Sequence, residues 1–328
     1  MKKIWIIIAV LSVVLNILFI RWIVGIYAPF DFFKNYHPTT KVVDTTKDTI
    51  HIFFNINDDY AKYLAVTMAS ILDNTDSPLY FHVFHTGLSP QNMKRLQQLK
   101  DFRDYDIEFI AFDATKLKDF PESRRADYLK KESLIRLFMP ELKPDIDKYI
   151  YIDVDTLVIA DINGLWQIDL DNEYVGAVRN LPHELFSIPQ QKELPYYNAG
   201  ILLVNAHKWR TDNLLSQFYT TIKKYHDHLP WLDQDVINIT LAGNIKELPT
   251  RYNSQINMTC FDVKGKSCNR FYSDIAIIHW NGPFKPWLVR PTSFNNLFWI
   301  YAYNTPFIDD IKKARLKNIV KTLFSPES

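Results

Sequence analysis

The stretch that most constrains the fold is an apolar run, Tyr149–Ile152, that ends in two acidic residues, Asp153 and Asp155. Four apolar or aromatic residues that follow charged ones predict a short buried strand. Alternate residues of an extended chain point to the same side, so both carboxylates can face one space. Ligands of open α/β sheets bind beside the carboxyl ends of the strands. Two oxygen ligands at that place suit Mg²⁺ or Mn²⁺ shared with the phosphates of a substrate.

The spacing of these two aspartates is not decisive by itself, because an ordinary polar end of a strand has the same appearance. Asp153 and Asp155 differ from the other Asp-x-Asp pairs of the chain in the hydrophobic strand that precedes them. The other pairs are Asp104/Asp106, Asp145/Asp147, Asp169/Asp171 and Asp233/Asp235.

Strands and helices alternate along most of the chain, which predicts βαβ units and an α/β fold with a mostly parallel sheet flanked by helices. The expected strands are Thr49–Asn55, Leu79–His85, Ile107–Phe112, Tyr149–Ile152, Tyr174–Val178, Ile201–Asn205 and Ile275–His279. The expected helices are Ala61–Leu72, Pro90–Leu99, Ser133–Leu142, Gln217–Tyr225 and one that begins near Asp233. Neither a Gly-x-Gly-x-x-Gly loop nor a Walker-type lysine loop is present. Metal and side chains would therefore have to neutralise the phosphates of a bound nucleotide.

The N-terminal residues predict a transmembrane anchor. Residues Ile4–Ile20 are almost entirely apolar and stand behind two lysines, and Trp22 and Tyr27 suit a membrane interface. A cleaved signal peptide is the rival interpretation, but no clear small-residue cleavage site follows. We therefore expect an anchor over residues 1–27.

The rest of the chain divides into three further segments. Residues 28–48 would be a linker, 49–290 the α/β domain and 291–328 a helical basic tail. The tail contains a basic amphipathic helix from Asp309 to Phe324, which would lie either on an anionic membrane surface or in solvent.

Composition narrows the possible functions. A formal net charge of +1 over 328 residues argues against a nucleic-acid-binding protein, whose surface would carry a strong positive excess. Cys260 and Cys268 are too few for a disulfide framework, and a single bridge between them is left open.

Several polar residues near strand ends are candidates for binding, each with an ordinary structural alternative. His279 ends a strand and would suit Mn²⁺, or it is structural. Lys285 would bind a phosphate or be solvated. Asn57 and Asp59 would bind a base and ribose, or make a turn and a helix cap. Arg136 would reach a phosphate or pair with Glu132 on its own helix.

Two more segments belong with these candidates. Asp233 and Gln234 begin a helix, where polar side chains ordinarily cap the first turn. Asn198-Ala199-Gly200 would bring the backbone close to a ligand, or would simply turn the chain.

In this order, the segments resemble glycosyltransferase family 8, and their joint occurrence between Ile50 and Trp287 is specific. The matching segments are Asn57–Tyr60, Tyr151–Val158, Tyr197–Asn205, Asp233–Asp235 and His279–Trp287. The relatives that this pattern suggests are bacterial galactosyl- and glucosyltransferases of lipopolysaccharide synthesis. The resemblance implies a GT-A domain with a Rossmann-like sheet that binds a UDP-sugar together with Mn²⁺ or Mg²⁺.

The resemblance also implies roles for individual residues. Asp153, Asp155 and His279 would bind the metal, and Gly282 and Lys285 the diphosphate. Asp233 and Gln234 would be the catalytic residues at the donor sugar, which Asn198 also lines. The nucleotide-sugar site would further include Asn55, Ile56, Asn57, Asp59, Tyr60, Arg136, Val154, Ala199 and Gly200.

The implied reaction transfers a hexose, galactose or glucose, to a glycan or glycolipid acceptor with retention of the anomeric configuration. An amide such as Gln234 is a poor nucleophile, so front-face attack by the acceptor hydroxyl is the favoured mechanism. The protein would be a single-pass membrane protein, on the cytoplasmic face if bacterial and in the Golgi lumen if eukaryotic.

Some positions depart from the family pattern, and two other functions compete. Asn57 stands where relatives often carry aspartate, Ser133–Arg136 replaces a Thr-Tyr-Tyr-Arg-like run, and Asn180 replaces an acidic sugar contact of some relatives. Asp153-Val-Asp155-Thr156 also matches the opening of haloacid-dehalogenase-like phosphatases, although that family carries it on the first strand. A non-catalytic carbohydrate-binding protein is the other alternative, and it would not need the three metal ligands.

Overall fold

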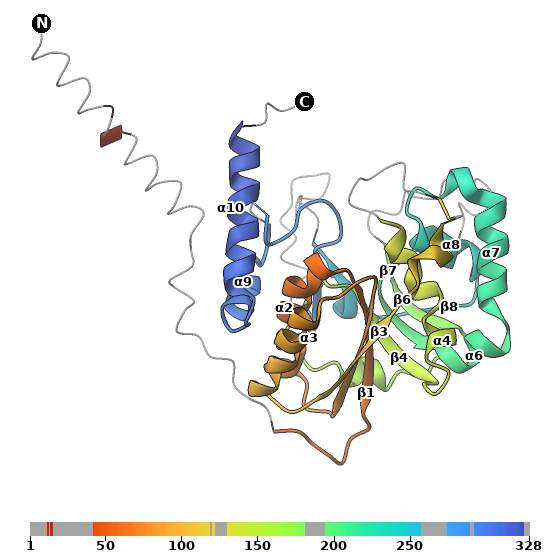
Figure 1. Ribbon diagram of the computed structural model, residues 1–328. Helices are drawn as coiled ribbons and strands as arrows, with labels where there is room; N and C mark the ends of the chain where they lie inside the picture. Colours follow the sequence, from red (N-terminus) through yellow and green to blue (C-terminus); the bar gives the residue numbers. More distant parts are fainter. Residues whose placement is uncertain are drawn as a thin grey trace, which may run out of the picture.

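A seven-stranded sheet forms the centre of the fold, with helices packed against it (Figure 1). The computed structural model describes Ser12, Val14, Leu15 and residues 42–118, 120–121, 130–180, 194–256, 274–288 and 292–324. The strands of the sheet lie in the order β3-β2-β1-β4-β7-β6-β8. Their bounds are β1 Ile50–Ile56, β2 Leu79–His85, β3 Asp106–Ala111, β4 Lys148–Ile152, β6 Val175–Arg179, β7 Tyr197–Asn205 and β8 Ile245–Glu247.

Four neighbouring strands, β3, β2, β1 and β4, run parallel, which confirms the expected α/β fold with a mostly parallel sheet. Strand β7 is the exception, because it runs antiparallel to both β4 and β6. The carboxyl end of β4 therefore lies beside the amino end of β7. There the Asp153 N–H donates to the Gly200 carbonyl at 2.8 Å.

The alternation of side chains along β4 separates two layers of the core. Ile150 and Ile152 face the layer that contains helices α2 (Ala61–Asn74) and α9 (Asn295–Tyr303). Tyr149 and Tyr151 face the opposite layer, which contains α7 (Leu214–Tyr225) and α8 (Asp233–Thr240). Asp153 follows Tyr151 by two residues, and the Tyr151 hydroxyl donates to its Oδ1 at 2.6 Å. The first aspartate thus continues the face of the two tyrosines.

A second, three-stranded sheet begins directly after the two aspartates. The chain turns out of β4 into β5 (Thr156–Val158), which pairs antiparallel with β10 (Ile277–His279). Strand β10 also pairs in parallel with β9 (Ser254–Gln255). The register places His279 opposite Thr156, and the Trp280 N–H donates to the Asp155 carbonyl at 3.0 Å. This sheet, which the sequence analysis did not predict, brings His279 to the aspartates.

The helix expected over Ser133–Leu142 is divided in two. Residues Lys131–Leu137 form a 3₁₀ helix and Met139–Leu142 form α4. Pro140 has no N–H with which to continue the hydrogen-bond pattern of a single α-helix, which explains the break. Other helices are α3 (Pro90–Gln97), α5 (Asn163–Trp166), α6 (Ala206–Thr211) and α10 (Ile308–Phe324).

The prediction of a single-pass membrane protein is contradicted. Within the residues that the structure describes, no helix is both long and apolar enough to cross a membrane. The longest of them, α10, has 17 residues and carries several basic side chains. A bilayer core requires about 20 predominantly apolar residues. Apart from Ser12, Val14 and Leu15, residues 1–27 lie outside the described part of the chain, as do Cys260 and Cys268.

Helix α9 is tied to α2 by a buried tyrosine. The Tyr301 hydroxyl donates to Asp73 Oδ2 at 2.7 Å and accepts from Asn74 Nδ2 at 2.8 Å. Phe298 and Trp299 of the same helix are buried in the core.

The domain limits expected from the sequence, 28–48, 49–290 and 291–328, stay predictions.

Stability should fall in acid because of a buried histidine on the sheet. His82 contacts Glu108 through Nδ1, and its Nε2 lies 2.9 Å from His51 Nδ1. Burial lowers the pKa of His82 from 6.5 to about 4. Between pH 6.5 and pH 4, His82 therefore binds a proton in the unfolded chain but not in the folded protein. Stability is complete above pH 6.5 and is lost as the pH falls towards 4, by about 3 kcal/mol in all.

Urea unfolding at pH 7 and pH 4.5 checks this expectation. In His82→Gln the acid-induced loss should be smaller by about 2–3 kcal/mol, because glutamine does not titrate. His226→Gln, which alters an exposed histidine, should retain the wild-type pH dependence. Equal acid losses in the wild type and in His82→Gln would contradict the assignment to His82.

Candidate active site

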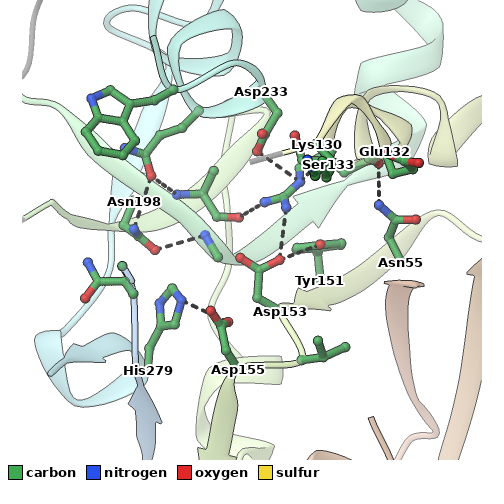
Figure 2. Close-up of a pocket in the computed structure, with 18 of the residues that line it drawn as sticks. Asn55, Lys130, Glu132, Ser133, Tyr151, Asp153, Asp155, Asn198, Asp233 and His279 are labelled. Carbon is green, nitrogen blue, oxygen red and sulfur yellow. Dashed lines mark hydrogen bonds and ion pairs between the residues drawn. The ribbon is translucent and has the colours of Figure 1, made fainter. Parts of the chain in front are cut away.

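A pocket of about 490 Å³ opens where β1 and β4 end and β7 begins (Figure 2). Of the site residues predicted from the sequence, Asp59 alone is absent from its lining; its side chain is exposed in the 3₁₀ helix Asp58–Tyr60. The predicted residues that line the pocket are Asn55, Ile56, Asn57, Tyr60, Arg136, Asp153, Val154, Asp155, Asn198, Ala199, Gly200, Asp233, Gln234, His279, Gly282 and Lys285.

Other lining residues were not predicted as site residues. They are Lys130, Glu132, Ser133, Tyr151, Asn180, Trp231, Asn281 and Pro283. Tyr151 carries a signal that the sequence analysis missed, since it lies two residues before Asp153 on the same face of β4. Asn57 fulfils the ordinary expectation as well, because its Oδ1 accepts the Tyr60 N–H at 3.2 Å while it lines the pocket.

Asp153, Asp155 and His279 come together at one end of the pocket. One ligand atom from each of the three lies within 4.8 Å of the others. His279 Nε2 faces Asp155 Oδ1 at 3.3 Å (Figure 2). The Lys285 ammonium contacts Asp155 Oδ2 and donates to the Trp280 carbonyl at 2.8 Å. Two carboxylates, an imidazole and an ammonium thus converge on one space.

The charges around Asp155 keep its carboxylate ionised. Burial would raise the pKa of Asp155, but the ammonium of Lys285 outweighs it and holds that pKa well below the ordinary value. Asp155 Oδ1 accepts no hydrogen bond from the described residues although it is buried. An ionised, buried oxygen beside an imidazole nitrogen fits a divalent cation of the Mn²⁺ or Mg²⁺ type.

Arg136 lies at the centre of the pocket wall and joins two aspartates. Its Nη2 is 2.9 Å from Asp153 Oδ1, its Nε is 3.1 Å from Asp233 Oδ2, and its guanidinium lies 4.2 Å from the centre of the Tyr151 ring. Its ion-pair partners are thus Asp153 and Asp233, and not Glu132, which was one of the two alternatives that the sequence left open. Burial raises the pKa of Asp233, and Arg136 opposes that rise. Arg136 therefore neutralises buried negative charge on both sides.

A network of amides forms the other end of the pocket. Gln234 Oε1 accepts from Asn198 Nδ2 and from the Ala199 N–H, each at 3.1 Å. Leu232, two residues before Gln234, has φ 47° and ψ −112°, a backbone conformation that L-residues rarely adopt. The turn it makes directs the first residues of α8 into the pocket.

Gly200 is the point of closest approach between backbone and side chains in the site. A Cβ atom at this position would lie 2.3 Å from Cε1 of His279 and 2.9 Å from Oδ2 of Asp153. Only glycine therefore allows the imidazole and the carboxylate to approach each other across the start of β7.

Comparisons with known proteins agree with this architecture. A sequence model of glycosyl transferase family 8 matches residues 51–290. A putative glycosyltransferase of Haemophilus influenzae is 30% identical over 255 residues, which cover 75% of this chain and 76% of that protein. A lipopolysaccharide 1,2-glucosyltransferase of Escherichia coli is 25% identical over 300 residues, covering 84% of this chain and 86% of that protein.

The fold has a solved counterpart as well. The crystal structure of the galactosyltransferase LgtC with donor and acceptor sugar analogs is similar, with a TM-score of 0.69 and 27% identity. The similarity covers 78% of this chain and 96% of that one, which supports a GT-A-like α/β fold. Since the family match extends over well more than half of its length, the chain belongs to glycosyl transferase family 8.

Proposed function

We propose that this glycosyltransferase is a metal-dependent, retaining hexosyltransferase that moves galactose or glucose from a UDP-sugar to a hydroxyl of a glycan or lipopolysaccharide acceptor. The observation that carries the proposal is the convergence of Asp153, Asp155 and His279 beside Lys285 at one end of the pocket. Similarity to a glucosyltransferase and a galactosyltransferase supports a hexose and an acceptor of this class.

The reaction breaks the bond between the anomeric carbon of the sugar and the UDP oxygen, and it leaves negative charge on the diphosphate. Bound Mn²⁺ or Mg²⁺ would stabilise that charge, and Asp153, Asp155 and His279 would hold it. Lys285 adds a second positive charge at the same end of the pocket. The loop before it contains Gly282, whose φ of 127° favours glycine.

The amide end of the pocket would receive the donor sugar. Asn198 and Gln234 are hydrogen-bonded to each other there, and Asp233 is held by Arg136. Because Gln234 is an amide, the acceptor hydroxyl itself would attack the anomeric carbon on the face from which UDP departs. The hydroxyl proton passes to the departing diphosphate, and the configuration is retained.

The competing functions have less support. A haloacid-dehalogenase-type phosphatase would need its Asp-x-Asp motif on the first strand, whereas Asp153 and Asp155 follow β4. A non-catalytic carbohydrate-binding protein would bind sugar without the metal ligands.

Release of UDP from a panel of UDP-sugars, with Mn²⁺ and then with EDTA, tests the proposal on the full chain. Slow hydrolysis of UDP-galactose or UDP-glucose that requires Mn²⁺ would support it and identify the sugar. No release from any donor, together with no metal-dependent binding of UDP, would overturn it. Sugar binding that is indifferent to EDTA and without UDP release would favour the carbohydrate-binding alternative.

Gly200→Ala should reduce UDP release by about 100-fold, because the added Cβ displaces His279 or Asp153 by a large fraction of an ångström or more. Gly176→Ala is the matched control. There a Cβ would lie 2.8 Å from the Leu248 side chain in the core, away from the pocket. That variant should be less stable in thermal unfolding but should release UDP at close to the wild-type rate. Equal activity of the two variants would show that the close approach at Gly200 has no functional importance.

A further inference from the structure

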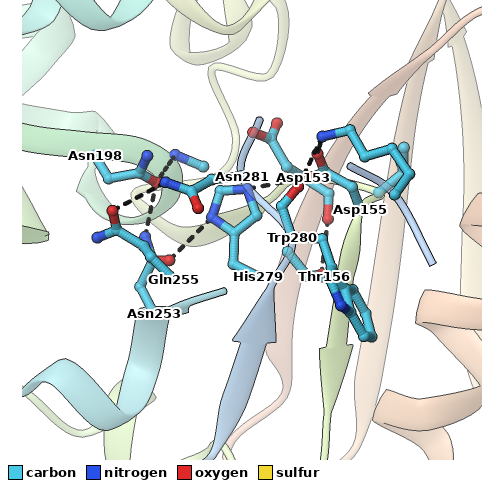
Figure 3. A network of polar contacts seen from close by, with 12 residues as sticks. Asp153, Asp155, Thr156, Asn198, Asn253, Gln255, His279, Trp280 and Asn281 are labelled. Carbon is cyan, nitrogen blue, oxygen red and sulfur yellow. Dashed lines mark hydrogen bonds and ion pairs between the residues drawn. The ribbon is translucent and has the colours of Figure 1, made fainter. Parts of the chain in front are cut away.

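A buried asparagine behind the pocket connects its two ends. Asn253 is the last residue of the 3₁₀ helix Thr250–Asn253 and is 1% exposed. It is not among the residues that line the pocket. Figure 3 shows it between His279 and Asn198. Its Oδ1 lies 2.9 Å from His279 Nδ1, and its Nδ2 donates to Asn198 Oδ1 at 2.8 Å.

One backbone N–H fixes the orientation of these groups. The Gly200 N–H can only donate, and it donates to Asn198 Oδ1 at 2.9 Å, so that atom must be the amide oxygen. The atom of Asn253 that faces Asn198 must then be its nitrogen, and its oxygen must face His279. An amide oxygen carries no hydrogen, so His279 Nδ1 must carry the proton of this hydrogen bond.

In the neutral imidazole, which is the form that binds metals, this order of donors leaves the other nitrogen with its lone pair towards Asp155. His279 Nε2 faces Asp155 Oδ1 at 3.3 Å, and two such electron-rich atoms are compatible when a cation lies near both. The Cε1 edge of the ring also lies against the backbone of Gly200, where a Cβ would be 2.3 Å from Cε1.

The same network reaches the sugar end of the pocket. Asn198, which accepts from Asn253, donates through Nδ2 to Gln234 Oε1 at 3.1 Å. The Ala199 N–H donates to the same Gln234 oxygen, which fixes that amide too. A continuous series of hydrogen bonds thus runs from His279 through Asn253 and Asn198 to Gln234.

We propose that Asn253 is a positioning residue that holds His279 in its metal-binding tautomer and aligns it with Asn198 and Gln234. The inference rests on the proposed metal-dependent function and adds a residue that touches neither metal nor sugar. Because Asn253 has two separate partners, its two roles can be separated by substitution.

Mn²⁺ binding to the full chain in the presence of UDP, followed by electron paramagnetic resonance, tests this proposal together with kcat. Asn253→Ala removes the acceptor for His279 and should weaken Mn²⁺ binding by about 10–100-fold. Asn253→Asp keeps that acceptor but turns an oxygen towards Asn198 Oδ1. It should bind Mn²⁺ at close to wild-type affinity while kcat falls by about 10-fold or more.

Asn74→Ala is the control, because it removes another amide with three hydrogen bonds, in α2 and away from the pocket. Its Mn²⁺ affinity should be that of the wild type even if its melting temperature falls. Wild-type Mn²⁺ affinity in Asn253→Ala, or unchanged kcat in Asn253→Asp, would overturn the role of Asn253 but would leave the proposed metal-dependent function in place. If Asn253→Ala does not fold, the split between affinity and kcat in Asn253→Asp decides. A wild-type protein that binds no Mn²⁺ would overturn the proposed metal dependence and this inference with it.

Discussion

Replacing Asp155 with asparagine is expected to lower metal-dependent UDP release by about 10³-fold or more, since a catalytic metal contributes several kcal/mol and each 1.4 kcal/mol is a factor of ten. Asparagine keeps the shape of the side chain but loses the negative charge that Lys285 stabilises. Lys285 retains its hydrogen bond to the Trp280 carbonyl, so the loop should keep its place. The rate of UDP release with Mn²⁺ measures the effect, and circular dichroism confirms that the variant is folded.

Asp104→Asn provides the matched control for this substitution. Asp104 belongs to another Asp-x-Asp pair, and its side chain is 89% exposed. Its replacement should change the rate by no more than about twofold, as is usual for surface substitutions. A folded Asp155→Asn protein that releases UDP at the wild-type rate would remove Asp155 from the catalytic machinery.

Replacing Arg136 with methionine is expected to lower the free energy of unfolding by about 3–5 kcal/mol, because a buried charge pair loses one partner. Arg136 is only 7% exposed and pairs with both Asp153 and Asp233. Methionine fills much of the same volume but leaves these carboxylates without their cation. Urea unfolding at neutral pH measures the loss. Arg136→Lys should recover only part of it, since one ammonium cannot reproduce the planar fork of the guanidinium.

Two further variants decide whether unpaired charge is the cause. The double variant Arg136→Met with Asp233→Asn should be more stable than Arg136→Met alone, because one unpaired carboxylate is gone. Arg179→Met breaks an ion pair with Glu247 in which both side chains are more than 40% exposed. It should cost less than about 1 kcal/mol. Similar losses in Arg136→Met and Arg179→Met would contradict the role assigned to the buried pairs.

The parts of the fold that local pattern determines were predictable. Strand β2 runs from Leu79 to His85, as expected, because its apolar run is bounded by turn residues. The carboxylates of Asp153 and Asp155 share a pocket because both follow directly on the end of β4, although the chain turns there towards β5 and is no longer extended.

Features that depend on contacts between distant segments were not predictable. The apolar run of β7 does not encode its direction, so its antiparallel place beside β4 was not foreseen. Strand β10 lies within the strand expected over Ile275–His279, but its partner β5 has only three residues, so the pairing of the two strands was not foreseen. For Arg136 the sequence offered a phosphate or Glu132 as partner, and neither alternative includes the ion pairs with Asp153 and Asp233 that the fold creates. Asn253 lies in a polar stretch with no periodicity, and only its buried partners reveal it.

The position of the three candidate ligands at the junction of two sheets has a thermodynamic consequence. Asp153 and Asp155 leave the large sheet at β4, whereas His279 ends a strand of the small one. In the unfolded chain these groups are far apart, so a cation that needs all three can bind the native state alone. By mass action, an ion that binds only the native state stabilises the junction of the two sheets. At a concentration 100 times its Kd it would raise the free energy of unfolding by about 2.7 kcal/mol.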